Sequence, residues 1–278
     1  MEQLRSDMDP RQYARHGHST THALIYLIQA IHETVDSGNY SVWIFYADVK
    51  KGFDIIDHNI LLNELNSLRI DQTLCFWIRA FLTNRTKAVR IGSSLSSWRH
   101  EHGGVPPGTI LCITLFALTL NDLLRDWHLR TKYVDDTTVL EVIPRNSLSM
   151  LDIVVRDIHE YCISHKMRLN PKKCKEMVIN FIANPSIVIR PTCTENQAVE
   201  TVTTCKLLGV TIREDLKWNS HVDYFIAKVA KRLYALRLLK RACVNPHDIL
   251  NVYISNVRSI LGYAIQVWQD IQSTCVIE

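Results

Sequence analysis

Hydrophobic residues near the start of the chain follow two different periods. Over residues 20–35 apolar side chains recur three and four positions apart, which predicts a helix with one buried face. Ser19 or Thr20 is suited to cap its first turn. A Gly-Asn pair at 38–39 ends this pattern, and an almost continuous apolar run follows from Val42 to Ala47. Such a run is typical of a strand that is buried on both faces.

The remainder of the chain alternates between helical and strand-like patterns. The apolar spacing predicts helices over residues 57–68, 74–82, 109 to about 124, 147–166 and 221–241. Short hairpins are predicted from Lys87 to the region of Trp98 and within residues 206–218. No internal repeat or low-complexity linker interrupts the order. We therefore expect an α+β fold.

Two adjacent aspartates, Asp135 and Asp136, lie between two β-prone stretches. A two-residue connection between strands predicts a tight hairpin, and paired carboxylates repel each other unless a cation offsets their charge. Asp48 directly follows the apolar run that ends at Ala47. Three carboxylates at strand ends are suited to hold two magnesium ions for phosphoryl transfer. An Asp pair can equally be a solvated turn, and an Asp after a strand can cap a helix.

Composition sets broad limits. The chain has 278 residues, 47% hydrophobic and 22% charged, which is typical of a soluble globular protein with one large domain or two small ones. Its net charge of +4 permits a nucleic-acid partner. Eight cysteines without a Cys-x-x-Cys pair indicate neither a zinc knuckle nor a disulfide framework. The polar N-terminus is unlike a signal peptide, and the longest apolar stretch is too short to cross a bilayer. We expect no membrane association and a cytoplasmic or nuclear location.

Five segments in order resemble the motifs of reverse transcriptases from non-LTR (LINE-type) retrotransposons. Motif A of that family has an Asp followed, after three residues, by a small residue and Phe-Asp, as in Asp48, Gly52 and Phe53. The segments similar to motifs B, C, D and E are Gly104–Phe116, Tyr133–Asp136, His165–Met177 and Lys206–Trp218. Gly17–Leu24 resembles the finger-proximal segment before motif A. The resemblance covers nearly the whole chain.

The resemblance implies the right-hand architecture of polymerases. The palm, with an antiparallel sheet and packed helices, is expected over residues 41–218, after a finger remnant at 1–40 and before a truncated helical thumb at 219–278. The implied activity is RNA-directed DNA polymerisation. Its partners are an RNA template, a DNA primer and deoxynucleoside triphosphates, and the oligomeric state stays open.

The same resemblance assigns the catalytic residues. Asp48 and Asp135 are expected to bind two Mg²⁺ ions, with Mn²⁺ as an alternative, and Asp136 completes the carboxylate cluster. The backbone carbonyl of Val49 is expected to be a further ligand, since magnesium prefers oxygen. Lys173 matches the motif D lysine, a candidate acid for the leaving pyrophosphate. Alternatively, it belongs to a solvated lysine cluster.

Four positions are expected at the nucleotide. Gly52 permits close approach of the triphosphate to backbone N–H groups. Phe53 stands where the family's aromatic ring excludes a ribose 2′-hydroxyl, although an ordinary core aromatic would look the same. Pro107 and Gly108 lie in motif B.

The resemblance also predicts contacts to the nucleic acid. Leu208 and Gly209 form the primer grip of motif E. Residues 217–241 contain seven Lys or Arg and one acidic residue. The residues expected to contact the nucleic-acid backbone are Lys228, Lys231 and Arg232. A merely solvated basic helix face is the alternative.

Motif B departs from the family pattern. Pro107 replaces the usual glutamine and so removes a side-chain amide and a backbone N–H. Cys112 and Ile113 replace a Gly-Pro pair. Only 47 residues precede Asp48, so we expect the upstream finger strands and their basic residues to be missing, with Arg15 or His16 as open substitutes.

These departures leave an alternative open. The chain is either a polymerase domain or a truncated, catalytically silent element copy that folds and binds nucleic acid without polymerising. A metal-dependent phosphohydrolase would use the same carboxylates, but no hydrolytic base motif accompanies them.

Overall fold

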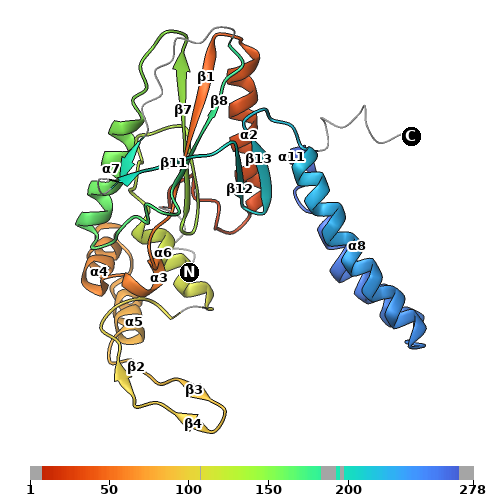
Figure 1. The fold of residues 1–278 in the computed structure, drawn as a ribbon. Coiled ribbons are helices and arrows are strands. Elements are labelled where there is room, and N and C mark those ends of the chain that lie inside the picture. The colour runs from red at the N-terminus through yellow and green to blue at the C-terminus, as the bar shows by residue number, and fades with distance from the viewer. Residues whose placement is uncertain (1–7, 107, 183–191, 195–196, 269–278) are drawn as a thin grey trace.

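The computed structural model describes residues 8–106, 108–182, 192–194 and 197–268. A central sheet carries helices on both faces, and two elements project from it, the β2–β5 segment and helix α8 (Figure 1). The helices are α2 (Thr20–Asp36), α3 (Gly52–Ile55), α4 (His58–Ser67), α5 (Gln72–Leu82), α6 (Ile110–Thr119), α7 (Leu151–Ser164), α8 (Asn219–Arg241), α9 (Pro246–Tyr253), the π-helical turn Ile254–Arg258, α10 (Ser259–Leu261) and α11 (Ile265–Trp268).

The five-stranded sheet has the order β11-β8-β1-β7-β6. Its strands are β1 (Tyr40–Ala47), β6 (Arg130–Tyr133), β7 (Asp136–Pro144), β8 (Lys175–Ile179) and β11 (Glu200–Thr201). All neighbours pair antiparallel except β11 and β8, which are parallel. The remaining strands pair two by two: β2 (Thr86–Lys87) with β5 (Arg99–His100), β3 (Arg90–Ile91) with β4 (Ser94–Leu95), β9 (Cys193–Thr194) with β10 (Gln197–Ala198), and β12 (Thr204–Leu207) with β13 (Val210–Arg213).

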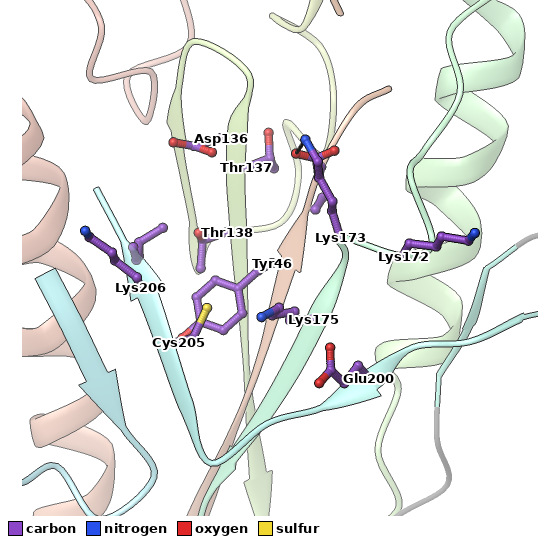
Figure 2. Close-up of a pocket in the computed structure, with 13 residues that line it drawn as sticks. Tyr46, Asp136, Thr137, Thr138, Lys172, Lys173, Lys175, Glu200, Cys205 and Lys206 are labelled. Atoms are coloured by element: carbon purple, nitrogen blue, oxygen red, sulfur yellow. Dashed lines mark ion pairs between the residues drawn. The ribbon is translucent and has the colours of Figure 1, made fainter. Parts of the chain in front are cut away.

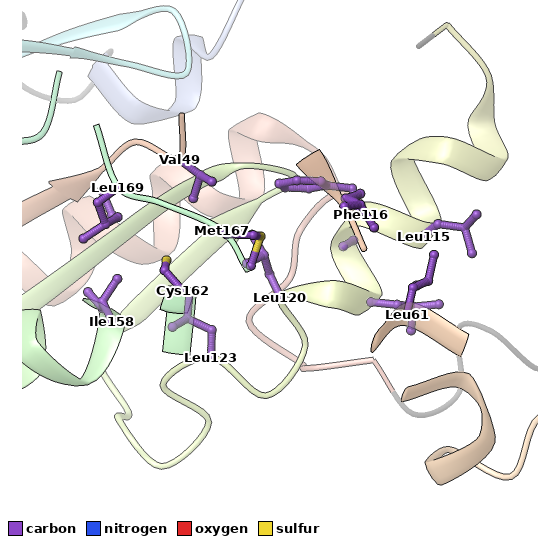
Figure 3. Packing of buried hydrophobic residues seen from close by; sticks show 14 of the residues in the cluster. Val49, Leu61, Leu115, Phe116, Leu120, Leu123, Ile158, Cys162, Met167 and Leu169 are labelled. Atoms are coloured by element: carbon purple, nitrogen blue, oxygen red, sulfur yellow. The ribbon is translucent and has the colours of Figure 1, made fainter. Parts of the chain in front are cut away.

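Strand β1 lies in the middle of the sheet and contributes side chains to two hydrophobic cores, one on each face. Because side chains alternate along a strand, Trp43, Phe45 and Ala47 enter one core and Val42, Ile44 and Tyr46 the other. The first core packs α4 to α7 against the sheet, including Leu61, Phe116 and Ile158 (Figure 3). The second packs α2 and the β12–β13 hairpin. Burial on both faces explains the continuous apolar run.

Two helices are shorter than their apolar patterns predict, because tertiary partners take over the terminal polar groups. Helix α7 begins at Leu151 rather than Ser147: Glu141 of β7 accepts hydrogen bonds from the Met150 N–H and the Ser149 hydroxyl. Helix α6 ends at Thr119 rather than near Leu124. There the Lys132 ammonium donates to the backbone carbonyls of Leu120 and Asn121. The Tyr161 hydroxyl donates to the backbone carbonyl of Thr119.

Helix α8 forms as predicted, but most of its apolar stripe is not buried. His221 is its only buried residue, and Ile226 and Leu233 are exposed. The stripe instead lines a groove of about 320 Å³ that is completed by Leu261 and Trp268. No helix among the described residues is long and apolar enough to cross a membrane.

Candidate active site

Asp48 follows the last residue of β1 and is fixed through its backbone. Its carbonyl accepts the Asn170 N–H at 2.8 Å, and its N–H lies 3.5 Å from the Cys174 sulfur. Both partners belong to the segment before β8. The predicted end of the buried strand therefore presents a carboxylate whose backbone cannot shift independently of the sheet.

Asp135 and Asp136 lie at the hairpin between β6 and β7. Tyr133 pairs with Asp136, so the two-residue loop is Val134–Asp135, one position earlier than the Asp pair itself. Val134 has a φ of 57°, which is uncommon for a β-branched residue and usual for glycine at this position of a type II′ turn. The hairpin that carries the aspartates is thus held in a strained backbone conformation.

Asp48 and Asp136 line one pocket of about 470 Å³, shown in Figure 2. Four lysines share its wall, namely Lys172, Lys173, Lys175 and Lys206. The lining includes Tyr46, Cys205 and Glu200 and does not include Asp135. A pocket with two acidic strand ends and a basic rim is suited to bind an anionic ligand together with a cation.

The three aspartates interact electrostatically. Partial desolvation, followed by the negative charges of Asp135 and Asp48, raises the pKa of Asp136 to about 6. The structure thus brings Asp48 close to an Asp pair far away in sequence, as the resemblance implies. Such mutual repulsion is relieved by a bound cation or by a proton.

Lys173 lies beside Asp48. Its Nζ is 3.6 Å from Asp48 Oδ1, and its side chain is 68% exposed, so the ion pair is weak and able to open. The other oxygen, Asp48 Oδ2, is buried without a hydrogen-bond partner among the described residues. Val49 is buried and faces Leu169 across an isolated β-bridge.

The donor atoms at this site are carboxylate oxygens, which are the ligands that a hard divalent cation prefers. Asp48 Oδ2 is a buried carboxylate oxygen without a hydrogen-bond donor in the described residues, and burial and then the neighbouring carboxylates raise the pKa of Asp136. A complete ligand set is not assembled, since no three His, Cys, Asp or Glu side chains within the described part of the chain are grouped to hold a metal. Asp48, Asp135 and Asp136 are the residues that would hold the ion.

Gly52 and Phe53 stand on the same side of the first core. A Cβ at Gly52 would lie 2.7 Å from the Phe116 ring, so packing alone requires glycine there. The rings of Phe53 and Phe116 pack against each other, tilted by 30° and with centroids 4.8 Å apart. Phe53 is half-buried, so one part of its ring packs in the core while another faces solvent.

Motif B is fastened to motif A through glycine. Gly104 has a φ of 75°, and a Cβ there would lie 2.7 Å from the Asp54 carbonyl oxygen. Its N–H donates to Ile56, and the Val105 N–H donates to Phe53. Gly108 has a φ of 94° with open space around it. Pro107 lies outside the described residues.

The expected primer grip is the turn between β12 and β13. Leu208 and Gly209 both have positive φ, at 45° and 87°, as in a type I′ turn. Tyr263 packs over Gly209 and donates its hydroxyl to the Leu208 carbonyl or to Thr20. No pattern in the sequence indicated this contact from the C-terminal part of the chain.

The basic residues of α8 differ in their surroundings. Lys228 and Lys231 are exposed. Arg232 is half-buried, and its Nη1 donates to the carbonyl and the side-chain oxygen of Asn256 at 2.9 and 3.1 Å. Arg232 therefore ties α8 to the following helical segment.

Sequence reasoning missed a buried cluster beneath the aspartate hairpin. Asp9 is fully buried and binds Arg130 at 2.6 Å and Lys132 at 2.8 Å. The backbone of Gln12 pairs with that of Lys132 in an isolated parallel β-bridge. The side-chain oxygen of Gln12 accepts a hydrogen bond from the Val134 N–H at 3.2 Å. Segment 9–13 thus braces the strained hairpin from the N-terminal side. Because charged residues are rarely buried unless paired, the Arg and Lys in strand β6 were the only available signal.

Comparison with known proteins identifies relatives of this arrangement. Residues 1–212 match the protein family described as reverse transcriptase (RNA-dependent DNA polymerase). The chain is 25% identical over 272 residues to the probable RNA-directed DNA polymerase from transposon BS of Drosophila melanogaster. It is 24% identical over 266 residues to the RNA-directed DNA polymerase from the mobile element jockey of the same species. These matches cover 91% and 90% of the chain and 29% and 28% of the relatives, so the chain spans under a third of their length.

A solved structure shares the fold. Telomerase from Candida tropicalis, in complex with a fragment of telomeric RNA, aligns with a TM-score of 0.51 at 14% identity. The alignment covers 87% of this chain and 41% of the telomerase chain. The predicted right-hand polymerase architecture is thereby confirmed.

Proposed function

Because the chain belongs to the reverse transcriptase family, we propose that it is the RNA-directed DNA polymerase domain of a non-LTR retrotransposon. The observation that carries the proposal is the meeting of Asp48 and Asp136 in one pocket, with Asp135 close enough to raise the pKa of Asp136. The substrates we propose are an RNA template, a DNA primer and deoxynucleoside triphosphates. Residues 1–40, 41–218 and 219–278 would act as fingers, palm and thumb, in the cytoplasm or the nucleus.

Asp48, Asp135 and Asp136 would hold divalent metal, which members of this family generally use. We propose two Mg²⁺ ions, which when bound would activate the primer 3′-hydroxyl and neutralise the developing pyrophosphate charge. The Val49 carbonyl accepts no hydrogen bond within the described part of the chain and is free to contribute an oxygen. Lys173 would leave Asp48 to donate a proton to the leaving pyrophosphate, which its exposed, weak ion pair permits.

The nucleotide would lie between motif A and motif B. Phe53 is held in place by Phe116, so its solvent-facing side can exclude a 2′-hydroxyl by contact. Gly108, which directly follows Pro107 in motif B, has open space at its backbone. Gly52 would let the backbone of motif A approach the triphosphate. Leu208 and Gly209 would support the primer end, while Lys228 and Lys231 would contact phosphates.

Primer extension tests the proposal. The full chain is supplied with an RNA template, an annealed DNA primer, Mg²⁺ and deoxynucleotides, beside an Asp135→Asn variant. We expect extension by the wild type and its loss in the variant. Extension by neither protein, with both still binding an RNA–DNA hybrid, would point to the silent copy instead. Pro107→Gln in the same assay shows whether the missing glutamine limits the rate.

A further inference from the structure

Helix α5 and the β2–β5 segment that follows it expose large apolar side chains to solvent. On the outer face of α5, Phe76 and Trp77 are each 70% exposed. In the β2–β5 segment, Ile91 is 77% and Trp98 66% exposed. We call residues 76–101 the α5–ribbon surface. In Figure 1 its strands project away from the central sheet.

The ribbon has no core of its own. None of the described side chains from residue 83 to 101 belongs to either hydrophobic core. A two-stranded ribbon is marginally stable in water without a packed face, and exposed apolar patches mark interaction sites. The α5–ribbon surface is therefore suited to bind a partner.

The charge of this surface indicates an anionic partner. Its basic residues are Arg79, Arg85, Lys87, Arg90 and Arg99, and its single acid is Glu101. Five positive charges and one negative charge give +4, which equals the net charge of the entire chain. The net positive charge of this one segment is therefore as large as that of the whole chain.

The positions of these charges are unfavourable within the chain itself. Lys87 lies directly opposite Arg99 in the β2–β5 pair, where like charges repel. Glu101 is already paired with Lys87. Arg90 and Arg99 are exposed and form no ion pair within the described residues. These guanidinium groups are available to an external anion.

We propose that the α5–ribbon surface binds single-stranded RNA. Unpaired bases would stack on Trp77 and Trp98, and the phosphates would contact Arg90 and Arg99. Exposed aromatic rings interleaved with cations are the arrangement that single-stranded nucleic acids require, since each base offers a face for stacking. A duplex has its bases already stacked and cannot use the rings. The choice of RNA rests on the proposed function, in which the uncopied template is unpaired RNA.

Binding is measured by fluorescence anisotropy of a labelled single-stranded RNA, in EDTA and without nucleotides, over a series of salt concentrations. Trp77→Ala and Trp98→Ala should each weaken binding at least about fivefold, because stacking on one ring contributes about 1–3 kcal/mol. Their salt dependence should not change. Arg90→Ala with Arg99→Ala should lower the slope of log affinity against log salt by about 1.4, roughly 0.7 per phosphate contact.

Matched controls come from exposed residues elsewhere. Phe181→Ala and Arg156→Ala remove an exposed ring and an exposed cation outside the surface, and both should bind as the wild type does. Affinity for a blunt RNA–DNA hybrid should be unchanged in the tryptophan variants. Wild-type RNA affinity in those variants, or an equal loss for the hybrid, would overturn the proposal. Because no catalysis is involved, an inactive wild-type chain would defeat the proposed function while leaving this result decisive.

Discussion

Gln12 supports the aspartate hairpin at a single atom. Its side-chain oxygen accepts the N–H of Val134, whose positive φ sets the direction in which Asp135 leaves the turn. We expect Gln12→Ala to lower the rate of primer extension about tenfold or more, since displacement by about 1 Å can cost about 10²-fold. Single-turnover incorporation measures this effect.

Replacing the strained residue provides the matching rescue. Glycine adopts positive φ without a steric cost, so adding Val134→Gly to Gln12→Ala should recover much of the lost rate. If the double variant is slower than Gln12→Ala alone, Gln12 does not act through the conformation of Val134.

The raised pKa of Asp136 makes stability depend on metal and pH. A carboxyl with a pKa of about 3.9 when unfolded and about 6 when folded binds its proton more tightly in the folded state. Without metal, stability should therefore fall as pH rises from about 4 to 6. Mg²⁺ should raise the melting temperature more at pH 7 than at pH 5. An equal Mg²⁺ shift at both values, or the same shift in Asp136→Asn, would contradict this cause.

Phe53 should determine the choice of sugar. Phe53→Val replaces the ring that packs on Phe116 by a smaller side chain. The space opened at the nucleotide should lower the preference for deoxynucleotides over ribonucleotides. The ratio of the two incorporation rates is the appropriate measurement, because a loss of stability would lower both equally. An unchanged ratio would assign Phe53 to packing alone.

Strand β6 depends on a buried carboxylate from outside the sheet. Asp9 is the anionic partner of both Arg130 and Lys132, and removing one partner of a buried ion pair typically costs about 3–5 kcal/mol. Asp9→Asn should lower the free energy of unfolding by about that amount in urea denaturation. Asp122→Asn breaks an exposed pair with Arg125 and should cost under about 1 kcal/mol. Similar losses in both variants would show that the buried cluster contributes no more than a surface pair.

Among the secondary-structure elements, the sequence pattern predicted those helix ends that are set by residues adjacent in sequence. Helix α2 begins after the cap residue Ser19, and Asp57 caps α4, because capping depends on neighbours in sequence. The ends of α6 and α7 were predicted wrongly because Lys132 and Glu141, from other elements, satisfy their terminal groups. Asp9 lies 121 residues from Arg130, a separation at which no periodicity carries information.

At the level of the whole molecule, the order of motifs predicted the right-hand fold, and the arrangement of surfaces was left undetermined. The apolar spacing predicted helix α8, but its apolar stripe lines an open groove, because the helix projects from the sheet (Figure 1). Amphipathic spacing reports that a face is apolar and does not report what covers it. The exposed rings of the α5–ribbon surface were unpredictable for the same reason.

Asp48 and Asp136 should act together in nucleotidyl transfer, and a third acidic residue in the same pocket provides the control. Glu200 lines the same pocket and lies outside the catalytic motifs. Single-nucleotide incorporation on an RNA template should slow by about 10²-fold or more in Asp48→Asn and in Asp136→Asn. Glu200→Gln should stay within a few-fold of the wild type. Equal rates in the wild type and both aspartate variants, or an equal loss in all three variants, would show that these two aspartates have no specific part in nucleotidyl transfer.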